Sequence, residues 1–182
     1  MSKTILYPFK INTDFRVGYA WSAELARRLR RNLTLFTTLD PTSPDPTVDI
    51  YSALVDAQGF YVRSFQLLQE RLRPVKSDRN FMSGEFDSTF LDFVSQHQPA
   101  ITVLQSDLLG NGLMKKIIKT RFQVIVLASG EIGKTQVAKK DRAQLFLSFL
   151  RHAACYNVPQ SVFNDISNDR HLFNSIAAFF RK

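Results

Sequence analysis

The sequence predicts one α/β domain built on a doubly wound, mostly parallel five-stranded sheet, with an extra C-terminal helix, strand and helix. Short apolar runs alternate along the chain with stretches whose apolar residues recur at helical spacing. Runs without internal charge are typical of strands that are covered on both faces, as in parallel sheets. At 182 residues, 45% of them hydrophobic, the chain has the size of one domain. We therefore expect a single domain over 1–182, with its core in 3–128 and a C-terminal extension in 136–182.

The first part of the chain predicts a strand, a helix and a second strand. Residues 3–9 form a compact β-prone run, and Asp14 is suited to cap a following helix that extends to Leu29. Residues 33–39 combine β-branched and apolar side chains without a charge, as expected of a strand buried on both faces. Two strands joined by one helix make a βαβ unit with a right-handed crossover.

The middle of the chain predicts a loop, two helices and an intervening strand. Three prolines in residues 40–47 exclude regular structure there. Residues 48–72 carry apolar side chains at helical spacing, residues 79–82 predict a short strand, and residues 87–96 predict a second helix. A proline follows each helix closely and marks its end. Asp87 is suited to cap the second helix.

The last part of the chain predicts two more buried strands and the extension. Residues 100–105 and 123–128 are apolar runs, and a helix is expected between them at 112–119. The extension predicts a helix at 141–156, a short strand at 161–164 and a terminal helix at 169–180. We expect these elements to cover or extend an edge of the sheet, because an open edge strand invites unwanted pairing.

Composition argues against secretion and against a membrane partner. The one cysteine, Cys155, has no partner for an internal disulfide, so we expect a small buried thiol in a reduced, cytoplasmic compartment. Pro8 interrupts the apolar run near the N-terminus, which differs from a signal peptide. No stretch approaches the roughly 18 apolar residues that a spanning helix needs.

The chain has a formal net charge of +8, and its cations are clustered near the ends of predicted helices. The clusters are Arg27, Arg28, Arg30 and Arg31, and then Lys115, Lys116, Lys119 and Arg121. Cations at helix C-termini are stabilised by the helix dipole, so we interpret both clusters as solvated faces and caps. Association with nucleic acid through these basic helices is kept as an alternative, although no aromatic-and-basic recognition motif accompanies them.

Four segments, taken in chain order, resemble one known family. They are Thr4–Phe9, Ala23–Leu29 with Leu33–Phe36, Gly84–Phe90 with Ala100–Leu104, and Gly112–Lys119 with Val124–Leu127. Their order resembles the universal stress protein family over about residues 3–128, by pattern more than by any rare motif. The resemblance implies an adenine nucleotide alpha hydrolase-like fold and, in some members, an ATP site at the carboxyl edge of the sheet.

The positions of that ATP site depart from the family pattern. An acidic residue is expected after the first strand, and Lys10 stands there; residues 105–108 replace the first two glycines of the phosphate loop. Gly112 matches the last glycine, but Leu113 follows it where a hydroxyl residue is expected. Glycines let backbone N–H groups approach phosphate, so we expect no bound ATP or AMP. Lys10, Gly110 and Gly112 remain the candidate positions of a remodelled nucleotide site.

A second phosphate-binding pattern follows the last predicted strand of the core. Residues 128–135 fit the form A-x4-G-K-T, in which Gly133, Lys134 and Thr135 would hold phosphate and Mg²⁺. No apolar strand ending in a metal-binding aspartate follows. We interpret this stretch as a polar turn that begins a helix, and keep phosphate binding there as an alternative.

The sequence predicts no catalytic and no metal-binding residue. His97, His152 and His171 lack partners at metal-ligand spacing, and no G-x-S-x-G elbow is present. Large apolar residues are frequent in the extension: Phe146, Phe149, Leu150, Leu172, Phe173, Phe179 and Phe180. We therefore expect a non-enzymatic stress-response or regulatory protein without a cofactor that forms a homodimer or binds a protein partner.

Overall fold

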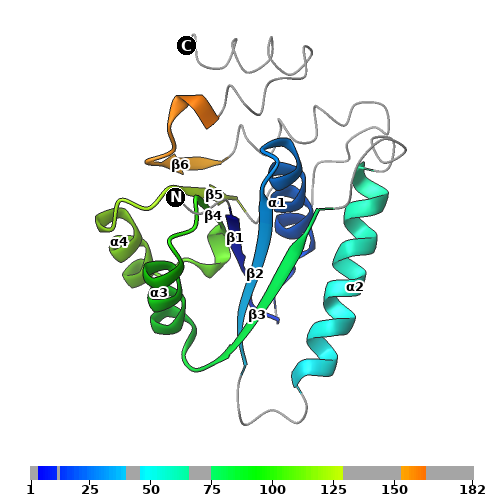
Figure 1. The fold of residues 1–182 in the computed structure, drawn as a ribbon. Helices are drawn as coiled ribbons and strands as arrows, with labels where there is room; N and C mark the ends of the chain where they lie inside the picture. Colours follow the sequence, from blue (N-terminus) through cyan, green and yellow to red (C-terminus); the bar gives the residue numbers. More distant parts are fainter. Residues whose placement is uncertain (1–3, 12, 40–45, 66–74, 129–152, 163–182) are drawn as a thin grey trace.

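The structure is a computed structural model of the chain, and it describes residues 4–11, 13–39, 46–65, 75–128 and 153–162 (Figure 1). In this part of the chain, six strands form one sheet in the order β3-β2-β1-β4-β5-β6. They are β1 (Thr4–Pro8), β2 (Asn32–Leu39), β3 (Ser77–Ser83), β4 (Ile101–Gln105), β5 (Val124–Leu127) and β6 (Ala154–Tyr156). The pairs from β3 to β5 are parallel, and β6 is antiparallel to β5. The predicted mostly parallel sheet is confirmed, with β6 as a sixth strand.

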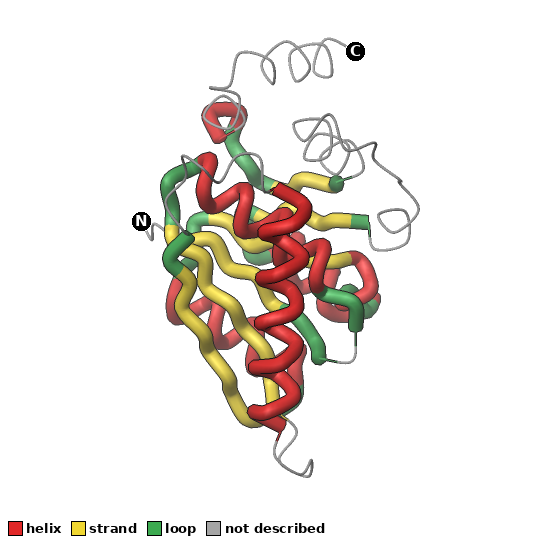
Figure 2. Tube along the Cα trace, turned by 90° about the vertical axis from the view of Figure 1, so that its right-hand side faces the viewer, coloured by secondary structure: helices red, strands yellow, loops and turns green. Residues whose placement is uncertain are grey.

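Helices cover both faces of this sheet. They are α1 (Arg16–Arg28), α2 (Pro46–Phe65), α3 (Phe86–His97) and α4 (Asn111–Lys119), and residues Ser106–Leu108 form a short 3₁₀ helix. Side chains of α1 and α2 form one apolar cluster with the strands, and those of α3 and α4 form another. Figure 1 shows the two helix layers on opposite sides of the sheet, and Figure 2 shows the α1 and α2 layer in front of the strands. The predicted doubly wound α/β fold class is therefore confirmed.

Alternate residues of β1 supply these two clusters, as the period of a strand requires. Ile5 and Tyr7 pack with α1 and α2, whereas Leu6 packs with α3 and α4. All four residues of β5 are buried, and they too alternate between the two clusters. The uncharged runs that predicted strands in the sequence are thus the strands with a helix layer on each side.

Two predicted elements of the extension are wrong. Residues 154–156, expected within a helix over 141–156, form β6, because their main chain pairs with Val124–Val126 at the sheet edge. Residues 160–162 are helical where a strand over 161–164 was expected; Pro159 accepts from the Val162 N–H, and proline favours a first helical turn. Cys155 is exposed, not buried as expected. The remaining predicted elements of the extension lie outside the described residues.

Two predicted helix caps also differ. The N-cap of α3 is Glu85, not Asp87: the Glu85 carboxylate accepts from the N–H groups of Asp87 and Ser88 at 3.1 and 2.9 Å. The N-cap residue of α1 is Phe15, one position after Asp14. Asp14 still accepts from the Arg16 N–H at 3.3 Å, and its carboxylate forms an ion pair with the Arg16 side chain.

Part of the first basic cluster is internal, which corrects its interpretation as a solvated face. The Glu24 side chain is fully buried, and it accepts from Arg27 Nε at 2.9 Å and from Arg28 Nε at 2.7 Å. The side chains of Arg27 and Arg28 are only 20% and 5% exposed. These two cations therefore neutralise a buried acid within α1.

Tyr61 of α2 is expected to make the free energy of unfolding depend on pH in the alkaline range. Burial, followed by the negative charge of Glu24, raises its pKa from about 10 to about 12. The folded state therefore holds the phenol proton more tightly, and this contribution to stability is complete below pH 10 and lost as pH rises to about 12. Urea titrations across this range should show a shallower loss of stability for Tyr61→Phe than for the wild type. Parallel curves for the two proteins would contradict this prediction.

None of the described helices is both long and apolar enough to cross a lipid bilayer.

Candidate functional site

The topology points to the ends of β1 and β4 as the place for a site. Strands β2 and β4 lie on opposite sides of β1, so the direction of the crossovers reverses between β1 and β4. At such a switch point, open α/β sheets form a crevice beyond the carboxyl ends of the strands, and ligands bind there. Residues after β1, including Lys10 and Asp14, and those after β4, including Asp107, border this place.

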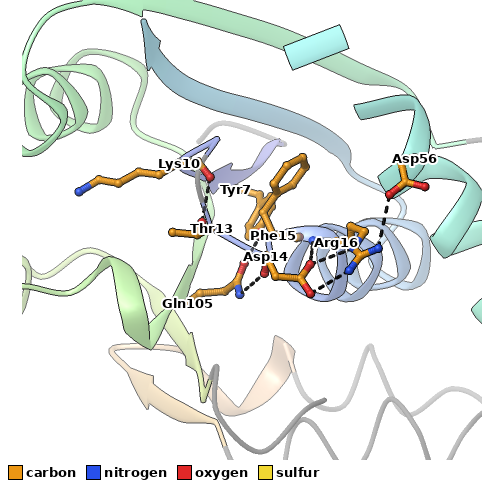
Figure 3. A network of polar contacts seen from close by, with 8 residues as sticks. All are labelled: Tyr7, Lys10, Thr13, Asp14, Phe15, Arg16, Asp56 and Gln105. Atoms are coloured by element: carbon orange, nitrogen blue, oxygen red, sulfur yellow. Dashed lines mark hydrogen bonds and ion pairs between the residues drawn. The ribbon is translucent and has the colours of Figure 1, made fainter. Parts of the chain in front are cut away.

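A polar network links the two strands at this point. The hydroxyl of Tyr7, a fully buried side chain of β1, lies within hydrogen-bond distance of the Phe15 carbonyl oxygen, at 2.9 Å, and of Gln105 Oε1. Gln105 ends β4, and its Nε2 donates to the Asp14 carbonyl oxygen at 3.1 Å. Figure 3 shows the Gln105 side chain reaching from β4 to the segment between β1 and α1. The network therefore connects the strands across the switch point from within the protein.

Gly18 allows α1 to lie against this network. A Cβ atom at this position would stand 2.3 Å from the Tyr7 hydroxyl oxygen and 2.6 Å from Gln105 Oε1. Real Cβ atoms do not approach other atoms so closely, so any larger residue would displace the helix or the network. The close approach of α1 thus packs the helix directly against the hydrogen-bonded side chains of Tyr7 and Gln105.

The Tyr7 phenol is held in its neutral form. Burial raises its pKa well above the usual value, and the carboxylates of Asp107 and Asp14 raise it further. The phenol therefore serves as a hydrogen-bond donor in the network, not as a base.

Lys10 is directed away from the network. Its ammonium lies 4.7 Å from the centroid of the Phe86 ring at the start of α3, a cation–π distance. Its carbonyl oxygen accepts from the N–H and hydroxyl of Thr13 at 3.2 and 2.8 Å. Figure 3 shows the Lys10 side chain extending away from Tyr7 and Gln105. The structure thus associates the predicted Lys10 with α3.

Of the other predicted positions, the structure describes Gly110 and Gly112, at the start of α4. Gly110 is the N-cap of α4 with an ordinary φ of −65°, and Gly112 lies in the first turn. A Cβ atom would meet nothing within 4 Å at either position, so neither glycine is required by a close approach within the described chain. Gly133, Lys134 and Thr135 lie outside the described residues.

A shallow groove of about 260 Å³ lies beside the network, between the start of α1 and α2. Its charged residues are Asp14, Arg16 and Asp56. Arg16 pairs with both carboxylates, with its Nε 3.0 Å from Asp14 Oδ1 and its Nη1 3.5 Å from Asp56 Oδ2. The hydrogen bond from Arg16 lowers the pKa of Asp14. The groove thus carries two negative charges and one positive charge, and Arg16 is shared between the two carboxylates. No group of three or more metal-ligating side chains occurs among the described residues.

Sequence reasoning missed the role of Tyr7 and Gln105. The available signal was a long hydrogen-bonding side chain near the carboxyl end of each of two largely apolar strand runs. Buried polar groups need partners, and the strand order of the structure, which places β1 beside β4, makes these two residues partners of each other.

Comparisons with known proteins give likenesses in fold alone. No family model and no curated protein matches the chain. Among solved structures, a universal stress protein in complex with cAMP is 12% identical, with a TM-score of 0.49, over 70% of this chain and 97% of that one. A universal stress family protein from Burkholderia pseudomallei is 13% identical, with a TM-score of 0.38, over 68% and 94% of the two chains. A hypothetical protein is 15% identical, with a TM-score of 0.39, over 71% and 98%. The likeness to universal stress proteins is confirmed at this level.

Proposed function

We propose that the chain is a non-catalytic, cytoplasmic stress-response or regulatory protein that acts by associating with itself or with a protein partner. In this proposal neither ATP nor AMP binds at the switch point of the sheet. The observation that carries the proposal is the buried network of Tyr7 and Gln105, closed from outside by α1 at Gly18. This network ties β1 and β4 together at the switch point, next to the place where a doubly wound sheet receives its ligand.

The energetics of this network oppose nucleotide binding. A phosphate entering between β1 and β4 would displace Gln105 and break its contacts with the Tyr7 hydroxyl and the Asp14 carbonyl oxygen, and each buried group left unsatisfied costs about 1–3 kcal/mol. The charges near the network are also unfavourable, since Asp14 and Asp107 act on the Tyr7 hydroxyl as negative charges. Lys10, the candidate cation, is engaged over Phe86. Among the described residues, the contacts between β1 and β4 therefore disfavour a polyanion.

The same contacts support a role without catalysis. The Tyr7 phenol keeps its proton, and the Asp14 carboxylate stays ionised in its ion pair with Arg16. Nucleic acid is not the partner proposed, because Arg27 and Arg28 of the first basic cluster pair with the internal Glu24.

Nucleotide binding is tested by urea unfolding of the purified chain with ATP, AMP or cAMP, with and without Mg²⁺. The cyclic nucleotide is included because one structural neighbour was crystallised with it. We expect no change in stability, whereas a site filled at 100 times its Kd would add about 2.7 kcal/mol. Mass spectrometry of the denatured protein should find no co-purified nucleotide.

A stabilising nucleotide would contradict the proposal, and two variants would then locate it. Loss of the effect in Lys10→Ala would assign it to the switch point, and loss in Lys134→Ala would assign it to the second phosphate-binding pattern. Hydrolysis of ATP by the wild type, abolished in either variant, would contradict the non-catalytic role.

A further inference from the structure

Among the described residues, no strand lies beside the outer edge of β3, and main-chain groups point outward there. Within the described part of the chain, β3 ends the sheet and has only β2 beside it. The Lys76 carbonyl accepts from the Leu33 N–H at 3.0 Å, so the even-numbered residues of β3 direct their main-chain groups to β2. The odd-numbered residues direct theirs outward: Ser77, Arg79, Phe81 and Ser83. Such an edge is a template for another strand.

An exposed apolar row on α2 adjoins this edge. Val48, Tyr51 and Val55 are 58%, 48% and 69% exposed, and they line a shallow hollow of the surface together with Ser52. The Tyr51 ring meets the Phe81 ring edge-on, with centroids 5.8 Å apart, and lies 5.5 Å from the Arg79 guanidinium. Figure 1 shows α2 running beside β3. Contiguous exposed apolar side chains of this kind mark interaction surfaces.

Resting on the self-association in the proposed function, we propose that two copies of the chain pair through β3. The two β3 strands lie antiparallel about a two-fold axis at Asn80 and join both sheets into one. The same axis brings the apolar row of α2 (Val48, Tyr51 and Val55) against that of the second copy. A single symmetry operation therefore covers both the open edge and the row.

Symmetry and charge select this register. Opposed residues of an antiparallel pair point to the same face, so the two-fold axis must pass through a residue position. An axis at Asp78 or Arg79 would set like charges opposite each other, which is unfavourable. An axis at Asn80 sets Ser77 opposite Ser83 and Arg79 opposite Phe81. All outward main-chain groups of both strands then form hydrogen-bonded pairs.

Electrostatic complementarity favours a second copy of the chain as the partner of the outer edge of β3. In this register, the Arg79 guanidinium of each copy lies between its own Tyr51 and the Phe81 ring of the other copy. Arg79 and Phe81 share the face that Tyr51 covers, so the cation–π contact already present is repeated across the interface. On the opposite face, Asp78 meets Met82, and no like charges are opposed.

A disulfide scan tests the register in a Cys155→Ser background. Asn80 would be a non-hydrogen-bonded pair across the axis, with Cα atoms about 4.5 Å apart, which suits a disulfide. We expect Asn80→Cys to form a covalent dimer under mild oxidation. Met82→Cys is the matched control, since it lies about 13 Å from its counterpart at roughly 3.3 Å per residue. Equal and slow cross-linking of the two variants would overturn the proposal.

Sedimentation equilibrium tests the α2 row independently. We expect the wild type to be a dimer and Val55→Asp, which places a carboxylate from each copy against the apolar row of the other, to raise the dimer dissociation constant about tenfold or more. Gln96→Asp on α3 should leave it unchanged. A dimer insensitive to Val55→Asp and not cross-linked by Asn80→Cys would overturn this interface but leave self-association standing. A monomer at high concentration would contradict self-association itself.

Discussion

Replacing Glu24 with Gln is expected to lower the free energy of unfolding by about 3–5 kcal/mol. The carboxylate is fully buried and accepts from both Arg27 and Arg28, whose side chains are themselves largely buried. The amide keeps the shape of the side chain but removes its charge, so two guanidinium groups lose their counterion in a region with little water. Urea unfolding of the variant and the wild type at neutral pH measures the loss.

An exposed ion pair provides the matched control. Asp56→Asn removes a carboxylate from Arg16, but both side chains are about half exposed. Such pairs contribute only about 0–1 kcal/mol, so this variant should unfold close to the wild type. If Glu24→Gln also unfolded within about 0.5 kcal/mol of the wild type, solvent would be reaching the Glu24 cluster, and its structural role would be wrong.

The ion pairs of Glu24 with Arg27 and Arg28 could be predicted from the sequence, but their burial could not. The spacing of Glu24, Arg27 and Arg28 is visible in the sequence and suits ion pairs on one face of a helix. Charged residues are rarely buried, so the pattern favoured a solvated face. Burial of this face follows from the packing of α2 against α1, which no local pattern in α1 contains.

The strands that are buried were predicted from the sequence, whereas the exposed edge strand β6 was not. The buried strands β1, β2, β4 and β5 were predicted, because a strand between two helix layers has an uncharged run of its own sequence. Strand β6 was missed because its residues are exposed or half-buried and become a strand only by pairing with β5. For the candidate site, the sequence alone showed that Lys10 and residues 105–108 differ from the ATP-site pattern of the universal stress protein family. That Gln105 reaches the Tyr7 hydroxyl depends on the strand order.

Replacing Gly18 with Ala is expected to destabilise the fold by about 2–4 kcal/mol. One added methyl group would overlap the Tyr7 hydroxyl and Gln105 Oε1, both in nearly fully buried side chains. Overpacking of this kind costs about 1–3 kcal/mol, and a hydrogen bond broken to relieve it adds about 1 kcal/mol. Gly112→Ala is the control, since its Cβ would meet nothing within 4 Å and alanine favours a helix by up to about 1 kcal/mol.

A double-mutant cycle separates contact with the network from a general loss of helix packing. Tyr7→Phe removes the oxygen that would stand 2.3 Å from the new Cβ, although the ring carbon at 2.8 Å remains. Gly18→Ala should therefore cost at least about 0.5 kcal/mol less in the Tyr7→Phe background than in the wild type. Additive effects would mean that α1 lies farther from Tyr7 than the structure has it. A ligand would then have room at the switch point, which would contradict the proposal that no nucleotide binds there.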